Sequence, residues 1–220
     1  MSDYESPIET VDVAIFTVRG GRLCVLLARR AKDPYAGVFA LPGGYIHPEE
    51  DDDVAATARR VLRDKIGLAA PYLEQLYTFS GKFRDPRGWS SSVAHYAVVP
   101  EALVGGALGD DVRLVPVDEL PALPFDHNDM VAMAVRRIRG KSSYSSLPTF
   151  LLPEEFTVDE LHAVYQQVLG VDLPKPTFRR KIEAQGIIVP VEGKMRVGPH
   201  RPAQMYRASH DTLREFDQAL

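Results

Sequence analysis

A cluster of basic side chains near the C-terminal end is the first feature of this sequence that could do chemistry. Between Pro174 and Arg207, eight Lys and Arg residues face only Glu183 and Glu192, although the whole chain carries a formal charge of −4. An acidic chain with one strongly basic segment is typical of a protein that binds a polyanion locally. The basic residues of this segment are Lys175, Arg179, Arg180, Lys181, Lys194, Arg196, Arg201 and Arg207.

The elements that would position this charge follow the order helix, helix, strand, loop, strand. Thr157 and Glu160 form a capping-box pattern that starts the first helix, and Gly170 ends it. The second helix is predicted from Pro176-Thr177 to Gly186. Strands are predicted at 187–191 and 204–208, with a loop between them. This order is that of a winged helix, in which the second helix enters the major groove of DNA.

The second helix and the loop at 192–203 supply the predicted contacts with double-stranded DNA. Arg side chains at a helix N-terminus can read guanine edges or bind phosphate, and a basic wing can contact phosphate or the minor groove. A solvated charged face is the alternative interpretation of these residues. The predicted DNA-binding residues are Lys175, Thr177, Arg179, Arg180, Lys181, Lys194, Arg196, His200 and Arg201.

Composition places few further limits on function. The chain has 220 residues, of which 45% are hydrophobic and 25% charged, as in ordinary globular proteins. We interpret Cys24, which stands in an apolar run, as a small core residue rather than a nucleophile. A single cysteine, together with an acidic N-terminal segment unlike a signal peptide, favours a cytoplasmic protein.

The first part of the chain alternates predicted strands and helices. Strands are predicted at 11–18, 23–28, 39–41, 75–79, 92–99 and 112–117, with a tight turn at 19–21 and a loop at 84–89. Helices are predicted from Asp51-Asp52-Asp53 to Ile66 and from Asn128 to Ile138. A Ser-rich polar segment follows. We therefore predict domains at 1–140 and 151–220, joined by a linker at 141–150.

The segment from Leu41 to Leu68 resembles the Nudix box, a glycine-rich loop followed by a helix with three glutamates that hold Mg²⁺. Pro42-Gly43-Gly44 matches the loop, and Arg60 and Gly67-Leu68 keep the family spacing, with two extra residues in the loop between Gly44 and Arg60. The three glutamate positions hold Val61, Asp64 and Lys65. The resemblance therefore implies the fold without the metal, and we predict no catalytic residue, no metal, no cofactor and little or no hydrolysis.

Almost the whole chain resembles the Nudix-related transcriptional regulators of the NrtR type. This resemblance implies an α+β fold, with a Nudix-like mixed sheet and flanking helices followed by a winged helix-turn-helix domain. It also implies a homodimer that represses transcription from an operator of two-fold symmetry. The effector would be ADP-ribose or a related NAD-derived nucleotide, although some relatives control sugar catabolism. The matching segments are 40–44, 84–88, 125–127, 151–157, 178–181 and 201–207.

An ADP-ribose effector would need cations or backbone donors for its diphosphate and an aromatic ring for its adenine. Lysine and arginine could supply the charge, and Tyr35, Tyr77 or Trp89 could stack. His127 could bond a ribose or a phosphate, or cap the helix that follows it. The predicted ligand-binding residues are Arg29, Tyr35, Gly43, Gly44, Lys65, Arg84, Arg87, Trp89 and His127.

Two other functions remain open at this point. The chain could be an active Nudix hydrolase that uses displaced carboxylates, such as Glu49, Glu50 or Asp53, with an accessory C-terminal module. It could also be a binding module whose basic end contacts an acidic protein. In the regulator interpretation, a shift of the helix 128–138 on ligand binding would alter the spacing of two winged helices.

Overall fold

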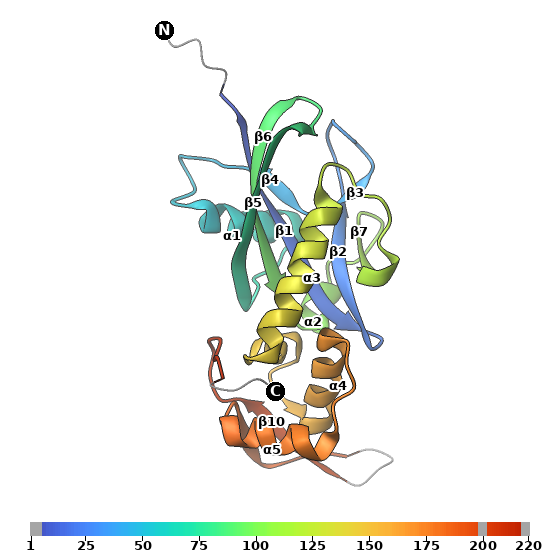
Figure 1. Ribbon diagram of the computed structural model, residues 1–220, viewed down its shortest axis with the longest axis vertical. Helices are drawn as coiled ribbons and strands as arrows, with labels where there is room; N and C mark the ends of the chain where they lie inside the picture. Colours follow the sequence, from blue (N-terminus) through green and yellow to red (C-terminus); the bar gives the residue numbers. More distant parts are fainter. Residues whose placement is uncertain (1–5, 198–201, 217–220) are drawn as a thin grey trace.

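The computed structural model describes residues 6–197 and 202–216 of the chain (Figure 1). These residues form a seven-stranded sheet followed by a three-stranded one, with helices packed on both. The predicted α+β fold is confirmed. No helix in the described ranges is both long and apolar enough to cross a membrane.

The larger sheet has the order β3-β2-β1-β6-β5, with β4 paired to β1 and β7 paired to β2. β1 is antiparallel to β2 and parallel to β6. The predicted turn between β1 and β2 is present, since Gly20 and Gly21 both adopt positive φ, as a tight two-residue hairpin requires. The strands are β1 (Ile8–Arg19), β2 (Arg22–Arg29), β3 (Phe39–Ala40), β4 (Gly43–Tyr45), β5 (Tyr72–Asp85), β6 (Gly88–Val98) and β7 (Val112–Pro116).

Two helices, α1 (Val54–Ile66) and α3 (His127–Ser143), cover opposite faces of this sheet (Figure 1). Successive residues of a strand point to opposite faces of the sheet, so side chains of β1 pack against both helices. Val13 and Ile15 pack in the cluster that contains the apolar side of α1. Phe16 packs in the cluster that contains the apolar side of α3. β1 therefore forms the centre of two separate apolar layers.

The start of α1 is set by the residues predicted to set it. The carboxylate of Asp53 accepts the Ala56 N–H at 2.6 Å as the N-cap, and Gly67 ends the helix in the left-handed conformation. Short helices α2 (Glu101–Gly105), η1 (Val117–Glu119) and η2 (Leu147–Leu151), which were not predicted from the sequence, complete the connections.

The predicted loop at 84–89 is wrong in extent. β5 and β6 continue until Asp85 pairs with Gly88, so only Pro86 and Arg87 form the turn. Trp89 consequently lies in β6, where it is half exposed. Long cross-strand pairing, which a short alternating pattern does not reveal, extends this hairpin.

The C-terminal elements form the predicted winged helix: β8 (Phe156–Thr157), α4 (Val158–Leu169), α5 (Lys175–Gln185), β9 (Ile188–Arg196) and β10 (Ala203–Ala208). The capping box of Thr157 and Glu160 is present, and Gly170 and Gly186 end α4 and α5 in the left-handed conformation. The predicted loop at 192–203 is shorter, because β9 continues to Arg196 and β10 starts at Ala203.

The helix predicted at 128–138 begins at His127 and continues to Ser143, across part of the predicted linker. The Tyr165 hydroxyl of α4 donates a buried hydrogen bond of 2.9 Å to the Ser145 carbonyl. One apolar cluster includes Ile138 of α3 and Leu161 of α4. The segment that joins the two parts of the chain is therefore ordered and partly buried. The domain boundaries themselves stay a prediction.

Candidate functional site

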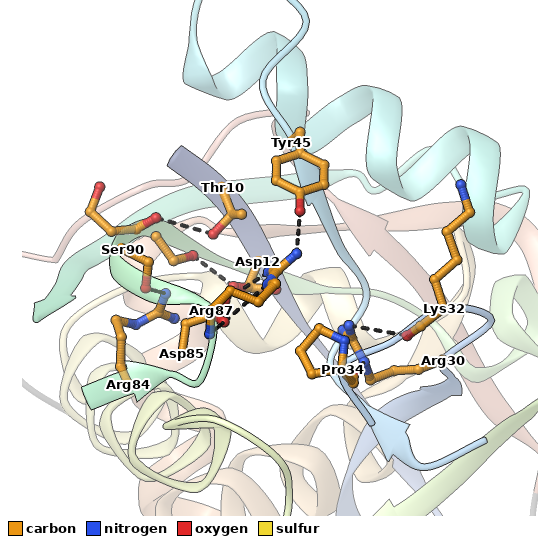
Figure 2. A network of polar contacts seen from close by, with 12 residues as sticks. Thr10, Asp12, Arg30, Lys32, Pro34, Tyr45, Arg84, Asp85, Arg87 and Ser90 are labelled. Atoms are coloured by element: carbon orange, nitrogen blue, oxygen red, sulfur yellow. Dashed lines mark hydrogen bonds and ion pairs between the residues drawn. The ribbon is translucent and has the colours of Figure 1, made fainter. Parts of the chain in front are cut away.

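A cavity of about 570 Å³ opens where the ends of β1 and β2, the β3–β4 connection, α1 and the β5–β6 turn meet the start of α3 (Figure 2). This volume lies within the range of small-molecule sites. Seven of the nine predicted ligand-binding residues line it. Those seven are Arg29, Gly43, Gly44, Lys65, Arg84, Arg87 and His127.

The face of α1 that carries the Nudix glutamate positions borders this cavity, since Val61, Asp64 and Lys65 all line it. Val61 is 1% exposed, and its side chain leaves little room for more than a hydrogen atom at Gly44. Asp64 accepts a hydrogen bond from Arg63 at 2.8 Å. Within residues 6–197 and 202–216, no group of three His, Cys, Asp or Glu side chains is placed to hold a metal ion. The residues present do not fit Mg²⁺.

Lys65 directs its ammonium group at the backbone carbonyl of Gly43 and donates a hydrogen bond to it. Burial lowers the pKa of this lysine, while the nearby Asp12 carboxylate opposes the shift. A cation thus lies on the helix face where the Nudix pattern requires a carboxylate. The predicted position of Lys65 in the pocket agrees with the structure.

The glycine at position 43 allows β4 to lie against a buried carboxylate. Asp12 and Gly43 are paired across β1 and β4, and Asp12 also accepts a hydrogen bond from the Ser92 hydroxyl at 2.7 Å. A Cβ at position 43 would overlap Asp12 Oδ1 and lie 3.0 Å from the Val11 carbonyl oxygen. Glycine is therefore needed here for close approach. Asp12 was not among the predicted residues, because it stands inside an apolar strand pattern.

His127 lies at the buried end of the cavity and is 1% exposed. Its Nδ1 accepts the Leu41 backbone N–H at 3.1 Å, and its Nε2 lies 3.6 Å from Asp12 Oδ1. Burial lowers the pKa of His127, against the opposing effect of the Asp12 and Asp126 carboxylates. The ring is therefore neutral, carries its proton on Nε2, and holds the segment before Gly43 in place.

Three of the predicted phosphate-binding arginines form ion pairs within the protein. Arg84 donates two hydrogen bonds to Asp126, both at 2.9 Å, and a third to Ser90 at 3.1 Å. Arg87 pairs with Asp85 at 2.7 Å and also contacts the Tyr45 hydroxyl (Figure 2).

Arg29 is the third of these predicted phosphate-binding arginines, and it pairs with Asp111 at 3.0 Å. The positive charge of each of these three arginines is thus already compensated by a carboxylate. Arg84, at 7% side-chain exposure, is the most deeply buried of them. These side chains shape the pocket and hold its walls together.

Arg60, the arginine of the Nudix pattern, has a similar structural role. It donates hydrogen bonds to both carboxylate oxygens of Asp51, at 2.8 and 2.6 Å, and to the Tyr45 carbonyl at 2.8 Å. These bonds from Arg60 hold the pKa of Asp51 far below its usual range. The pair fixes the inserted loop on α1.

Two cations that the sequence analysis missed lie just after β2. The guanidinium of Arg30 donates to the Pro34 carbonyl at 2.8 Å (Figure 2) and stacks 4.8 Å above the Phe125 ring. Burial lowers the pKa of Arg30, and the charge on Arg87 lowers it further. Lys32 also lines the cavity. Arg30 is adjacent to Arg29 in sequence, but Arg29 stacks on Phe39, at 4.6 Å, whereas Arg30 stacks on Phe125 of the cavity wall.

The aromatic residues predicted for adenine do not line the cavity. Tyr35 packs edge-on against Phe125 at 5.1 Å between ring centroids, and Trp89 and Tyr77 are half exposed on the β5–β6 hairpin. Phe125 and Tyr45 are the aromatic side chains that line it. The displaced carboxylates of the hydrolase alternative, Glu49, Glu50 and Asp53, are not among the lining residues either.

The second candidate site is the exposed face of α5 and the adjoining hairpin. Phe178 and Ile182 are buried, and Phe178 contacts Tyr165 of α4 at 5.2 Å between centroids. This packing leaves the opposite face of α5 to solvent. On it, Lys175, Thr177, Arg179 and Arg180 are exposed, and Lys181 is partly exposed.

Several of these cations form surface ion pairs: Lys175 with Asp159 at 3.2 Å, Arg179 with Glu183 at 2.9 Å, Lys194 with Glu155 at 2.6 Å, and Arg196 with Glu160 at 3.4 Å. Exposed pairs contribute only about 0–1 kcal/mol each, so a phosphate group can compete for such cations. The predicted residues His200 and Arg201 lie outside the described residues.

Comparison with known proteins agrees with this two-part architecture. Residues 8–134 match the NUDIX domain family, and residues 148–208 match the NrtR DNA-binding winged helix domain. A protein of Acinetobacter baylyi, described as an ADPR responsive transcriptional repressor NtrR, is 37% identical over 221 residues, which cover 98% of this chain and 86% of that protein. This chain belongs to the NrtR family.

This NrtR family member is also similar to two solved structures of Shewanella oneidensis NrtR. The structure of that NrtR complexed with a 27mer DNA has 33% sequence identity and a TM-score of 0.88, and the match covers 96% of this chain and 98% of that chain. The NUDIX domain in complex with ADP ribose has 34% identity and a TM-score of 0.56, and covers 61% of this chain and 90% of that chain. The predicted family resemblance is confirmed.

Proposed function

We propose that this protein is a transcriptional repressor that binds operator DNA through α5 and the β9–β10 wing and senses ADP-ribose, or a related NAD-derived nucleotide, in the cavity beside α1. The combination that supports the proposal is an exposed basic α5 in a winged helix joined to a nucleotide-sized pocket without metal-holding carboxylates. The relatives described as a repressor, as a DNA complex and as an ADP-ribose complex support the same function.

In the proposed pocket, the effector's diphosphate lies against the backbone of Gly43 and Gly44 and the ammonium of Lys65. These three residues combine close backbone approach with a positive charge. Arg29, Arg84, Arg87 and His127 support the walls through the contacts already described, while Tyr35 and Trp89 lie too far out to line the cavity. A homodimer is part of the proposal, because an operator of two-fold symmetry requires two recognition helices.

We further propose that the protein has little or no hydrolase activity. Val61 offers no oxygen for a metal, and Lys65 repels one. A sensor needs binding and not turnover, so the loss of these carboxylates is compatible with regulation. An assay of ADP-ribose hydrolysis with Mg²⁺ tests this part directly, and turnover at ordinary enzymatic rates would favour the hydrolase alternative.

The experiment that tests the proposed function is DNA binding at stated salt concentration, with the regions upstream of the protein's own gene and its neighbours as probes. We expect a specific shift of one probe that ADP-ribose or NAD reverses. A specific shift that no nucleotide affects would keep the regulator and exclude these effectors. The absence of any specific shift would contradict the proposal.

A further inference from the structure

Not every basic side chain that lines the cavity forms an ion pair with a carboxylate. Seven basic residues and five aspartates line it. Four of the basic residues have carboxylate partners within 4.0 Å, and these pairs are Arg29–Asp111, Arg60–Asp51, Arg84–Asp126 and Arg87–Asp85. The other three basic residues are Arg30, Lys32 and Lys65.

For these three cations, no carboxylate of residues 6–197 or 202–216 lies within ion-pair distance. Arg30 and Lys32 come from the segment after β2 (Figure 2), and Lys65 comes from the last turn of α1. They are close enough that the charges of Arg30 and Lys32 both lower the pKa of Lys65, in addition to its burial. Cations held together in this way repel one another until an anion binds between them.

Two of the three, Arg30 and Lys65, are also held in place by contacts within the protein. Arg30 is fixed by its bond to the Pro34 carbonyl and by the Phe125 ring, and its Nη1 has no hydrogen-bond partner among the described residues. Lys65 is held by the Gly43 carbonyl. A guanidinium fixed by packing loses little entropy when it binds a phosphate, and an ammonium acts there as a compact point charge.

We infer that Arg30, Lys32 and Lys65 bind the diphosphate of the effector directly, with Lys65 in place of the divalent ion, so that the nucleotide binds without Mg²⁺. This inference rests on the proposed function and specifies how its effector is held. A diphosphate diester carries one negative charge on each phosphate, which these cations neutralise. Magnesium would have to bind beside the Lys65 ammonium, where only Asp64 of the three Nudix positions offers a carboxylate.

The experiment is calorimetric titration of the full-length protein with ADP-ribose, once in EDTA and once in excess Mg²⁺. We expect the wild-type Kd to agree within about twofold between the two buffers. Lys65→Met should weaken binding about 10- to 100-fold in both, since a charge-assisted contact with the diphosphate is lost. Lys82→Met is the matched control, because Lys82 lies on the hairpin tip and does not line the cavity, and it should bind as wild type.

Two further variants keep the test valid if Lys65→Met fails to fold. Lys32 is exposed, so Lys32→Met should fold normally and still weaken binding several-fold. Lys65→Glu places a carboxylate beside Asp64, and its residual binding should improve with Mg²⁺ while that of the wild type does not.

The outcomes separate the inference from the proposed function. Wild-type binding that is abolished by EDTA, or Lys65→Met and Lys32→Met variants that both bind as wild type, would overturn the inference and leave an ADP-ribose sensor. No binding of ADP-ribose by the wild type in either buffer would overturn both.

Discussion

His127 and Leu41 are joined by a buried hydrogen bond of 3.1 Å, in which the imidazole Nδ1 of the first residue of α3 accepts the backbone N–H that precedes Pro42 and Gly43. The start of α3 is therefore tied to the glycine loop of the pocket. The far end of α3 leads to Ser145, whose carbonyl accepts the Tyr165 hydroxyl of α4. One helix thus connects the cavity with the winged helix, along the route by which we expect effector binding to shift DNA affinity.

Replacement of His127 by Ala should destabilise the protein and weaken nucleotide binding. The Leu41 N–H would remain buried without a partner, which alone lowers the free energy of unfolding by about 1–3 kcal/mol. Urea unfolding of the variant measures this loss. His210→Ala, at an exposed position, is the control and should leave the unfolding curve unchanged.

The same histidine predicts a pH dependence of stability. Burial lowers its pKa below the ordinary 6.5, so the folded state keeps the ring neutral where the unfolded chain binds a proton. The free energy of unfolding should therefore fall as the pH decreases below about 6.5, by at most about 1.4 kcal/mol per pH unit for this one group.

Unfolding curves of the wild type and of His127→Gln between pH 7 and 5 check this sign. The wild type should lose stability faster than the variant, which keeps the contribution of His95, whose pKa burial also lowers. Equal slopes would show that His127 does not carry the linkage.

The contact between Gly43 and Asp12 predicts that Gly43→Ala damages the pocket. The added methyl group must displace a buried carboxylate or the Val11 backbone, and such overpacking lowers stability by about 1–3 kcal/mol. ADP-ribose affinity should fall with it. Gly140→Ala is the control: it lies inside α3 with open space around its Cα, and should stabilise the protein by about 0.5–1 kcal/mol.

Local signals in the sequence were sufficient to predict most elements. The Asp53 cap, the Thr157–Glu160 capping box and the glycines after α1, α4 and α5 act within one helical turn, so they can be recognised without a structure. The end of α3 could not be predicted in this way. Gly140 and the serines after it favour a turn locally, yet packing of Ile138 and the buried Ser142 keeps them helical.

The pocket was predicted in outline, and its charge pairing was not. Asp111 and Asp126 compensate Arg29 and Arg84 from distant parts of the chain, and no local pattern indicates such partners. Arg29 is the last residue of β2 and Arg30 the first residue after it, where the alternation of a strand no longer sets the direction of the side chain. For that reason the arginine without a carboxylate partner could be identified only from the fold.

The basic face of α5 predicts which substitutions weaken DNA binding. Arg179→Ala with Arg180→Ala should reduce operator affinity at least about tenfold and lower the salt dependence of binding, because each lost phosphate contact reduces the slope by roughly one. Fluorescence anisotropy at several salt concentrations measures both. Arg59→Ala, an exposed arginine on α1, is the control, and equal affinities of control and double variant would contradict the assignment of α5.

The measurement that tests an effector-controlled repressor most directly is the ADP-ribose affinity of the free protein compared with that of the protein saturated with operator DNA. Thermodynamic linkage requires the two ligands to weaken each other by the same factor. We predict that the DNA complex binds ADP-ribose more weakly, by the factor with which ADP-ribose weakens DNA binding. Equal affinities of the free and DNA-bound protein for ADP-ribose would contradict the proposed regulation.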